Sequence, residues 1–501
     1  MIEKAAGKPS GAGLAGGVSW ILMGSLVVQA VGFAVKPIVG RWLGPTGLGL
    51  YSLSFILYGL AGLVGNFGVS QSLVRYTAAN EERHTVLGEV CFSGLLVSAV
   101  CGALAGFILF QLRQPIASLL HEPAMASCIA VISFSIPFSS LILAETGLLN
   151  GLRRMATFAG VISTQVILRA LLVLVLARLG RTIVLSLWGL VLSDAVTSVL
   201  GALAIRRLGL LVFKPWRRTV RTAVRLLSFG RFMLGVSAVN NVSNRVDSLL
   251  IGYFMSTASV GAYTPAKSLA ALLELVPTAV RRMVFAHTSR LWSLGKRLEL
   301  LRTIEKGMKY SASVMLLVGV GAGLFAKDAV RLLFGAEYVV AVAPLYALIA
   351  IRVLTGGLTV PIGSLFPALG KPGINLGIEI LILGVNVGLA VLLIPRLEML
   401  GAALAMVVSL GIGHGIQLGL LRRIAGVRVD TQWYCRALCI AGTAVGMSIM
   451  LERCGMNALV ARSMALLSQA TATWLLLLTA EDRKGICLAM KRRTEGREEH
   501  Q

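Results

Sequence analysis

Long apolar runs alternate with short polar segments along nearly the whole chain. Each run is close to the roughly 20 residues that a helix needs to cross a bilayer. The pattern predicts an all-α polytopic membrane protein with about fourteen transmembrane helices. Their approximate limits are 17–39, 48–69, 88–110, 127–149, 157–177, 183–205, 229–253, 262–284, 308–326, 343–364, 374–394, 401–421, 436–451 and 458–479.

Two segments between these runs, 206–231 and 281–309, alternate cations with apolar residues at helical spacing. We expect both to lie on the inner leaflet, with the apolar face down and the cations toward anionic lipid. The first segment also divides the chain, with six spans before it and eight after it. The predicted parts are an N-lobe at 1–205, a cytoplasmic amphipathic linker at 206–228, a C-lobe at 229–421, and a C-terminal part at 422–501 with two spans and a basic tail.

Composition and charge agree with this class. The chain has 501 residues, of which 56% are hydrophobic and 14% charged, and its net charge is +25. In a soluble protein that charge would suggest nucleic acid, but here the cations lie mainly in segments between apolar runs, so topology explains them and no nucleic-acid partner is expected. Their distribution predicts a multi-pass protein of the cell membrane with both termini in the cytoplasm. No Walker A motif is present, so direct use of ATP by this chain is not expected.

The runs at 229–253 and 262–284 carry an unusual number of polar residues. A charge in the hydrocarbon core costs at least roughly 2.5–3.5 kcal/mol on insertion scales, so such residues normally face a bundle interior or a watery cavity. Asp247 and Lys267 lie at similar distances from the turn that joins the two runs, so they could also simply neutralise each other. The polar positions are Asn240, Asn241, Asn244, Arg245, Asp247, Lys267 and Glu274.

Single charged or titratable residues occur in several other spans. For Arg169, Arg352 and Arg462 we expect a salt bridge with Glu145, Asp194 or Glu379, or snorkelling of the side chain to the interface. His414 stands among glycines, where a packed helix contact is a simpler explanation than a proton carrier.

A short motif occurs in both halves of the chain. Gly49 and Tyr51 are followed by Ser52, and 212 residues later Gly261 and Tyr263 are followed by Thr264. Each copy opens a helix that is expected to run from outside to inside. Six spans separate the copies, an even number, so the repeat is parallel rather than inverted. Transporters are often built from such repeats, with a site near the midplane between them.

A set of short segments follows in order along most of the chain. They are Arg41-Trp-Leu-Gly-Pro with Gly49-Leu-Tyr51, Gly68-Val69 with Val74-Arg75-Tyr76, Arg245-Val-Asp247 with Gly252-Tyr-Phe, Val260-Gly261-Ala-Tyr263, Leu333-Phe334-Gly335-Ala-Glu337-Tyr338, Gly370-Lys371, and Ile394-Pro395 with Gly401-Ala402-Ala403. In these segments the chain resembles the polysaccharide transporters, or Wzx-type oligosaccharide-lipid flippases, of the multidrug/oligosaccharidyl-lipid/polysaccharide flippase superfamily. Pro265 and Lys267 are a departure, because they stand in a segment where that family more usually has small residues.

This resemblance implies two pseudo-symmetric six-helix lobes around a central cavity, plus two C-terminal helices, that work by alternating access. The implied substrate is an isoprenoid pyrophosphate bearing an oligosaccharide, used in cell-surface polysaccharide biosynthesis. Other membrane proteins of polysaccharide assembly are possible partners, and anionic membrane lipids are expected ones.

Moving such a substrate makes no bond, so cations in a hydrated cavity must meet the pyrophosphate. We expect Arg245 to be the main contact for the head group, with Asn241 and Asn244 near it. Lys267 is the second candidate, and Arg75, at the inner end of span two, could meet the head group on entry. Arg75 could equally be an ordinary positive-inside anchor. Asp247 and Glu274 are candidates for coupling to an ion, since buried carboxylates titrate or bind cations. The sequence leaves proton, sodium and neither open, and predicts no other cofactor and no metal.

Two other functions are open. A multidrug or cation antiporter of the same superfamily would favour a cavity of carboxylates and aromatic residues. The charged residues within the predicted spans of this chain are instead mostly basic. A membrane glycosyltransferase or polymerase would need a sizeable outside loop with acidic residues, but the predicted outside segments are all short. A transporter rather than an enzyme is therefore expected.

Overall fold

The computed structural model describes residues 11–80, 83–210, 216–278, 280, 288, 291, 294, 296–358, 366, 372–427 and 429–477. Every regular element among these residues is helical, which confirms the predicted all-α class. Contacts divide the chain into two compact units. Unit 1 comprises Met1–Pro265, Leu333–Val340 and Val387–Ala402, and unit 2 comprises Ala266–Leu332, Ala341–Asn386 and Ala403–Gln501. Gly370-Lys371, the start of the second basic segment and the tail after residue 477 fall outside the described residues.

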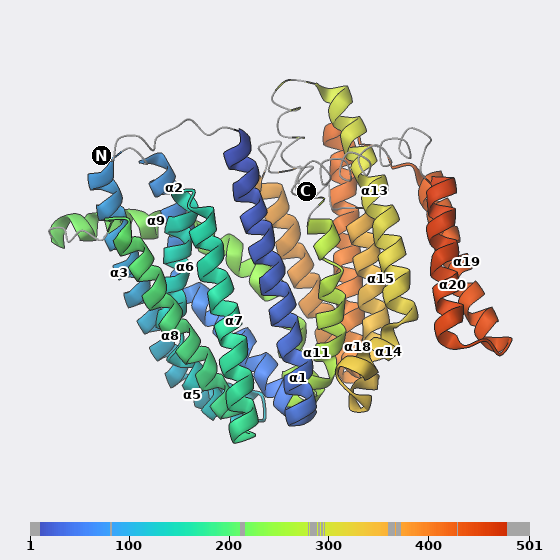
Figure 1. Ribbon diagram of the computed structural model, residues 1–501, viewed down its shortest axis with the longest axis horizontal. Helices are drawn as coiled ribbons and strands as arrows, with labels where there is room; N and C mark the ends of the chain where they lie inside the picture. The colour runs from blue at the N-terminus through green and yellow to red at the C-terminus, as the bar shows by residue number, and fades with distance from the viewer. Residues whose placement is uncertain are drawn as a thin grey trace, which may run out of the picture. The chain divides into compact units, whose positions relative to one another are not determined.

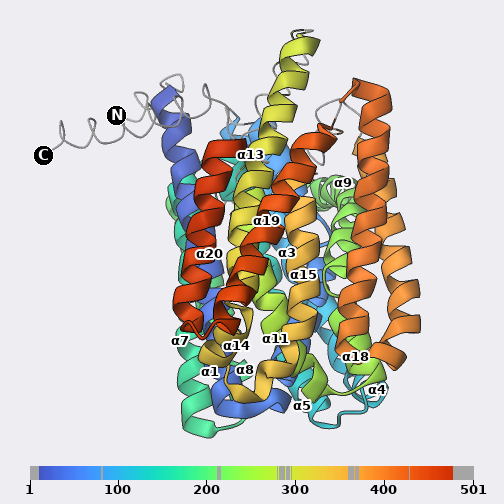
Figure 2. The ribbon, with the colours of Figure 1, turned by 90° about the vertical axis from the view of Figure 1, so that its right-hand side faces the viewer.

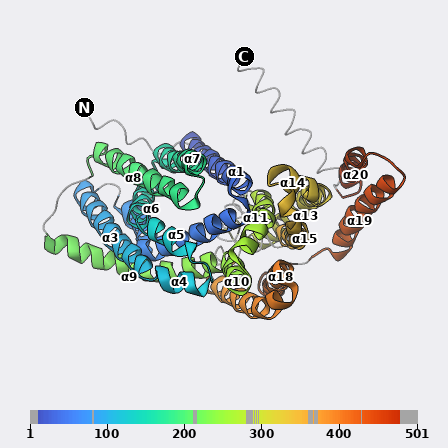
Figure 3. The same cartoon turned by 90° about the horizontal axis from the view of Figure 1, so that it is seen from below.

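Unit 1 is a bundle whose long helices pack side by side; α7 lies against both α8 and α1 (Figures 1 and 3). An apolar core formed by α2, α3, α6, α8 and α9 holds this bundle together. Its helices are α1 (Gly11–Asn66), α2 (Val69–Ala79), α3 (His84–Gln111), α4 (Arg113–Leu119), α5 (Ala124–Ser133), α6 (Ile136–Gly151), α7 (Met155–Gly180), α8 (Ile183–Arg207), α9 (Trp216–Ser243) and α10 (Val246–Phe254).

Unit 2 has its own helices, and α11 (Thr257–Leu272) runs from the end of unit 1 into it. Within it α13 packs against α15, α19 and α20 (Figure 2). The remaining elements of the chain are α13 (Arg297–Leu324), α14 (Ala326–Leu333), the 3-10 helix η1 (Ala336–Ala341), α15 (Val342–Leu358), α18 (Pro372–Ala425), α19 (Thr431–Arg453), α20 (Ala458–Ala472) and the π-helical turn η2 (Thr473–Leu477). Of these, η1 up to Val340 and the middle of α18, Val387–Ala402, belong to unit 1.

Among the described residues, nine helices are long and apolar enough to cross a membrane, and ten if α5 and α6 are counted as one bent span. The predicted number of fourteen is therefore not confirmed. One reason is that two helices each hold two predicted spans: α1 changes direction at Gly44, with φ of 67°, and α18 at Glu398, with φ of 52°. Both residues have a positive φ that is not helical, so each of these elements is two helices joined at a kink.

The predicted span 127–149 is formed by two helices, α5 and α6. α5 and α6 meet at an angle of 44°. The break lies next to Pro137, in the first turn of α6. Proline has no backbone N–H to donate to the preceding turn, so a continuous helix through this point would lose a hydrogen bond.

The predicted span 229–253 is also broken, at Asn244 and Arg245, between α9 and α10. Side-chain amides in the last turns of α9 donate to carbonyls four residues earlier: Asn240 to Val236 at 3.0 Å and Asn244 to Asn240 at 2.8 Å. Such side-chain bonds compete with the backbone ladder and bend helices. Arg245 therefore lies at a helix junction, with φ of −131°, and not on a continuous helical face as expected.

Helix α9 crosses the end of α3 instead of running along it (Figure 1). Thr222 on its inner face donates to Glu89 of α3 at 2.5 Å, whereas Trp216, Val220 and Val224 are exposed beside the arginines of its first turns. The cytoplasmic linker predicted to end at residue 228 thus continues, within the described residues, as one helix to Ser243.

The two copies of the motif that is repeated in the sequence contact each other. Ser52 Oγ lies 2.9 Å from Thr264 Oγ1, and these two residues are equivalent in the repeat. A Cβ on Gly49 would lie 1.9 Å from the Thr257 carbonyl oxygen, and one on Gly261 would lie 1.8 Å from that of Pro45. Pro45 and Thr257 are also 212 positions apart, so the contact is reciprocal in the way of a two-fold interface. Only glycine permits backbones to approach so closely.

Candidate functional site

A polar cavity of about 390 Å³ lies within unit 1, among helices α1, α2, α6, α7 and α9. Asn and Gln side chains supply the amides of its lining, and serines supply the hydroxyls. Amides and hydroxyls both donate and accept hydrogen bonds. The polar lining residues other than Arg169 and Tyr58 are Asn66, Gln71, Gln165, Asn241, Ser70, Ser139 and Ser237.

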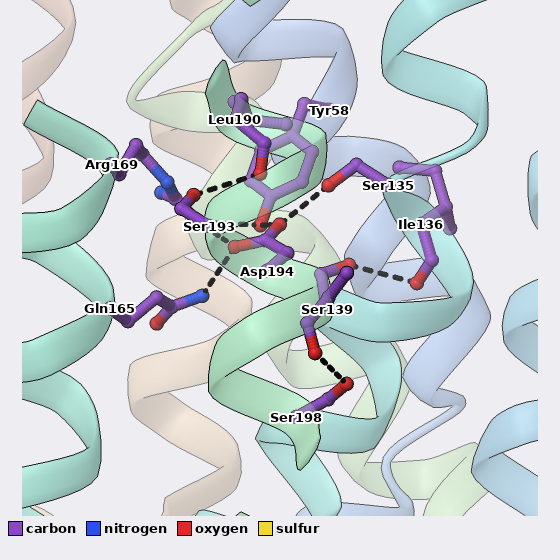
Figure 4. A network of polar contacts seen from close by, with 11 residues as sticks. Tyr58, Ser135, Ile136, Ser139, Gln165, Arg169, Leu190, Ser193, Asp194 and Ser198 are labelled. Carbon is purple, nitrogen blue, oxygen red and sulfur yellow. Dashed lines mark hydrogen bonds and ion pairs between the residues drawn. The ribbon is translucent and has the colours of Figure 1, made fainter. Parts of the chain in front are cut away.

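One wall of the cavity is held by a buried network around Asp194 of α8 (Figure 4). Arg169 of α7 donates to Asp194 Oδ1 at 2.6 Å, and Gln165, one turn before it, donates to the same oxygen at 3.0 Å. Tyr58 and Ser135 donate to Oδ2 at 2.7 and 2.6 Å. The salt bridge of Arg169 with Asp194, one of the pairings expected from the sequence, is confirmed.

This network neutralises Arg169, the only charged side chain among the described residues of the cavity wall. The Asp194 side chain is fully buried and that of Arg169 is 13% exposed. Removing one partner of a buried pair leaves an uncompensated charge, which costs about 3–5 kcal/mol. We therefore expect Asp194→Ala to lower the thermal stability of the purified protein strongly.

The matched control is the double variant Arg169→Met with Asp194→Leu, which removes both charges. Apolar replacements of a whole buried pair are often close to neutral, so the double variant should recover most of the melting temperature. A double variant less stable than Asp194→Ala would show that the pair acts through something other than charge compensation.

Arg245 borders this cavity. Its Nη1 donates to the Ile56 carbonyl of α1 at 3.1 Å, and a Cβ on Gly59 would lie only 1.9 Å from the same nitrogen. Gly59 lines the cavity. The guanidinium therefore occupies space that any other residue at position 59 would fill.

The other predicted polar residues of α9 and α10 are divided by the helix break. Asn241 lines the cavity, and its Nδ2 donates to the Ser237 carbonyl at 2.9 Å, which leaves Oδ1 as an acceptor. Asn244 is exposed. Asp247 is buried; it accepts from the Ser248 backbone at 2.8 Å and from Tyr263 at 3.2 Å.

The remaining predicted residues lie elsewhere. Arg75 of α2 is exposed and stacks on the Phe229 ring, with its Cζ 4.6 Å from the ring centroid. Lys267 lies half-buried in α11. Glu274 forms an ion pair with Arg352 of α15 within unit 2. The expected pairing of Asp247 with Lys267 stays a prediction.

Sequence reasoning missed the amides contributed by Asn66, Gln71 and Gln165. Gln165 could have been found, because it precedes Arg169 by one helical turn and shares its face. Asn66 and Gln71 flank the turn at Phe67 and Gly68, where both residues have positive φ. At that turn the backbone lies close to α9: a Cβ on Gly68 would lie 2.2 Å from the Gly230 carbonyl oxygen.

Unit 2 contains a second, larger cavity of about 1390 Å³, of different character. It lies among α13, α15, α18 and α19, and most of the residues that line it are apolar. At one end Arg462 of α20 donates to Glu452 at 2.8 Å and also pairs with Asp328. The expected pairing of Arg352 and Arg462 with acidic residues is thus observed, although with partners other than those named from the sequence.

The chain is similar to known proteins over most of its length. A family model described as Polysaccharide biosynthesis protein matches residues 38–343. The probable flippase AglR of Haloferax volcanii is 27% identical over 250 residues, or 49% of this chain and 51% of AglR, so the chain spans about half the length of that relative. The probable low-salt glycan biosynthesis flippase Agl15 of the same organism is 23% identical over 435 residues, or 84% of this chain and 86% of Agl15.

A solved structure shares the fold. The lipid II flippase MurJ in an inward closed conformation has a TM-score of 0.73 and 13% identity, over 90% of this chain and 98% of that one. At this identity the likeness concerns the fold alone. It agrees with the resemblance noted from the sequence, and the family match covers more than half of the chain. The chain is a multi-pass membrane protein that belongs to the polysaccharide biosynthesis protein family.

Proposed function

We propose that this protein is a flippase that moves an isoprenoid-pyrophosphate-linked oligosaccharide from the cytoplasmic to the outer leaflet by alternating access, for cell-surface polysaccharide biosynthesis. The family match and the relatives that are named as flippases support this proposal. The barrier to such a transfer is the passage of a polar, anionic head through hydrocarbon, where unsatisfied polar groups cost several kcal/mol each.

The observation that carries the proposal is a polar cavity among helices of unit 1, of which α1, α7 and α9 are long and apolar enough to span a bilayer. Its amides and hydroxyls would replace the water that the head group loses. Arg245 at the border of the cavity is our candidate for the contact with pyrophosphate, and Asn241 in its wall is a candidate for the contact with the sugars. Lys267, Asn244 and Arg75 are further candidates, and Asp247 and Glu274 remain candidates for coupling to a proton or sodium ion.

The apolar cavity of unit 2 is a candidate site for the lipid part of the substrate. The apolar cavity of unit 2 matches the chemistry of an isoprenoid chain, which need not leave the hydrocarbon core during transfer. A carrier of apolar cations would instead need carboxylates and aromatic rings in its polar site. Among the described lining residues of the unit 1 cavity, Tyr58 is the one aromatic residue, and its hydroxyl donates to Asp194.

A deletion strain tests the proposal. Cells that lack the protein should accumulate complete lipid-linked oligosaccharide in the inner leaflet and lose the corresponding surface polysaccharide, and the gene on a plasmid should reverse both effects. Normal surface polysaccharide in the deletion strain, with no accumulated lipid-linked intermediate, would refute the proposal.

The proposed direction of transport rests on the orientation of the chain. We expect a reporter fused after Gln501 to read cytoplasmic. An even number of spans that starts in the cytoplasm also ends there, and the excess of basic residues in the inside segments supports this orientation. An alkaline phosphatase fusion and a fluorescent protein fusion give opposite signals for the two orientations. An active phosphatase at this position would reverse the predicted topology.

A further inference from the structure

We propose that the polar cavity of unit 1 is a subsite for the uncharged sugar residues of the transported lipid, separate from the contact that holds its pyrophosphate. This inference rests on the proposed function and deepens it. Its grounds are the charge, the chemistry and the size of the cavity.

The first ground is charge. Within the part of the chain that the structure describes, Arg169 is the only charged lining residue, and its guanidinium donates both to Asp194 and to the Tyr58 hydroxyl, at 2.6 and 3.0 Å. The pair carries no net charge. Apart from Arg245 at its border, which we assign to the pyrophosphate, the described lining offers no free cation to an acidic sugar and no free carboxylate to a cationic ligand. A neutral, strongly hydrogen-bonding ligand is the class that remains.

The second ground is the kind of polar group present. A sugar hydroxyl both donates and accepts, and Asn, Gln and Ser side chains also do both. The Gln71 side chain is exposed, and no hydrogen bond joins it to another described residue. Asn241 keeps its oxygen as an acceptor. These two groups face the cavity from α2 and α9, so a ligand could bridge them.

The third ground is size and position. About 390 Å³ lies at the small end of the range for ligand pockets, roughly 300–1,000 Å³, so the cavity would hold part of an oligosaccharide at a time. Arg245 stands at its border beside Gly59. A head group could therefore place its pyrophosphate at Arg245 and its first sugars in the cavity.

The test is binding to the full-length protein in lipid nanodiscs with three probes. These are an isoprenoid pyrophosphate with no sugar, the same lipid with a neutral hexose, and the same lipid with a hexuronic acid. Wild-type protein should bind the neutral-sugar lipid several-fold more tightly than either other probe. Equal binding of all three, or preference for the acidic sugar, would overturn the inference.

Two variants sharpen the test. Gln71→Leu and Asn241→Leu should each weaken binding of the neutral-sugar lipid roughly tenfold, the effect of leaving one polar group unpaired, and leave the sugar-free lipid unchanged. Gln111→Leu, the same change at an exposed position at the end of α3, is the matched control and should alter neither. Unchanged binding of the sugar-free lipid also shows that the variants are folded.

The outcomes distinguish a failure of the proposed function from a failure of the sugar subsite alone. If wild type binds none of the lipids, the proposed function fails and the sugar subsite fails with it. If wild type binds the lipids but Gln71→Leu and Asn241→Leu weaken all of them equally or not at all, the proposed function survives and the sugar subsite does not.

Discussion

Replacing Arg245 with glutamate is expected to abolish transport while the protein accumulates to normal levels. The guanidinium lies at a helix junction beside the polar cavity, where it would meet the pyrophosphate of the substrate. A carboxylate there would repel the same group. Surface polysaccharide in a deletion strain that expresses the variant, normalised to protein level, gives the readout.

Two further substitutions separate charge from hydrogen bonding at this position. Arg245→Gln keeps a donor for the Ile56 carbonyl but loses the charge, and should reduce transport by about 10- to 100-fold, since charged hydrogen bonds contribute about 1.5–3 kcal/mol. Arg245→Lys keeps the charge and should retain part of the activity. Full activity in Arg245→Gln would mean that the residue only supports the helix junction.

Substituting alanine for Gly49 is expected to destabilise the protein by about 3 kcal/mol or more, the upper end for overpacked sites. The new methyl group would lie 1.9 Å from the Thr257 carbonyl oxygen, a backbone atom that cannot rotate away. Gly261→Ala should have a similar effect, because its methyl group would meet Pro45 in the equivalent way. Thermal unfolding of the purified variants measures both.

The same helix provides a control. A Cβ on Gly32 of α1 would have no neighbour within 4 Å, so Gly32→Ala should leave stability unchanged or raise it by about 0.4–1 kcal/mol. The double variant Gly49→Ala with Gly261→Ala should cost less than the sum of the single changes, because both strain one contact. Strict additivity, or a tolerated Gly49→Ala, would contradict the reciprocal packing.

The class of protein and its repeat could be predicted from the sequence because both are local signals. Apolar runs of membrane length indicate helices, and Gly49 and Gly261 precede tyrosines at a constant offset. The structure adds that the two copies touch, which depends on the path of the backbone between them. The pattern of apolar and polar residues does not determine that path.

The interruptions of the helices were harder to predict. Pro137 could have marked the break between α5 and α6, but a proline is also compatible with a kinked single span. The break at Arg245 follows from the amides of Asn240 and Asn244 bonding to the backbone, and these residues had been interpreted only as a polar helical face.

The candidate site was predicted in part. Arg245 and Asn241 were found because polar residues are conspicuous in an apolar run. Gln71 and Asn66 were not, because they lie next to a turn, where polar residues are ordinary. Phe67 and Gly68, both with positive φ, form the turn between these two residues, and the structure places the two amide side chains in the cavity lining.

The central claim is tested most directly with purified protein in sealed vesicles that contain a fluorescent isoprenoid-pyrophosphate-linked oligosaccharide in both leaflets. A membrane-impermeant quencher added outside reaches only the outer leaflet. We predict that the protein makes the inner pool accessible, and that the Arg245→Glu variant does not. An inner pool that stays protected in vesicles with the wild-type protein would contradict the account.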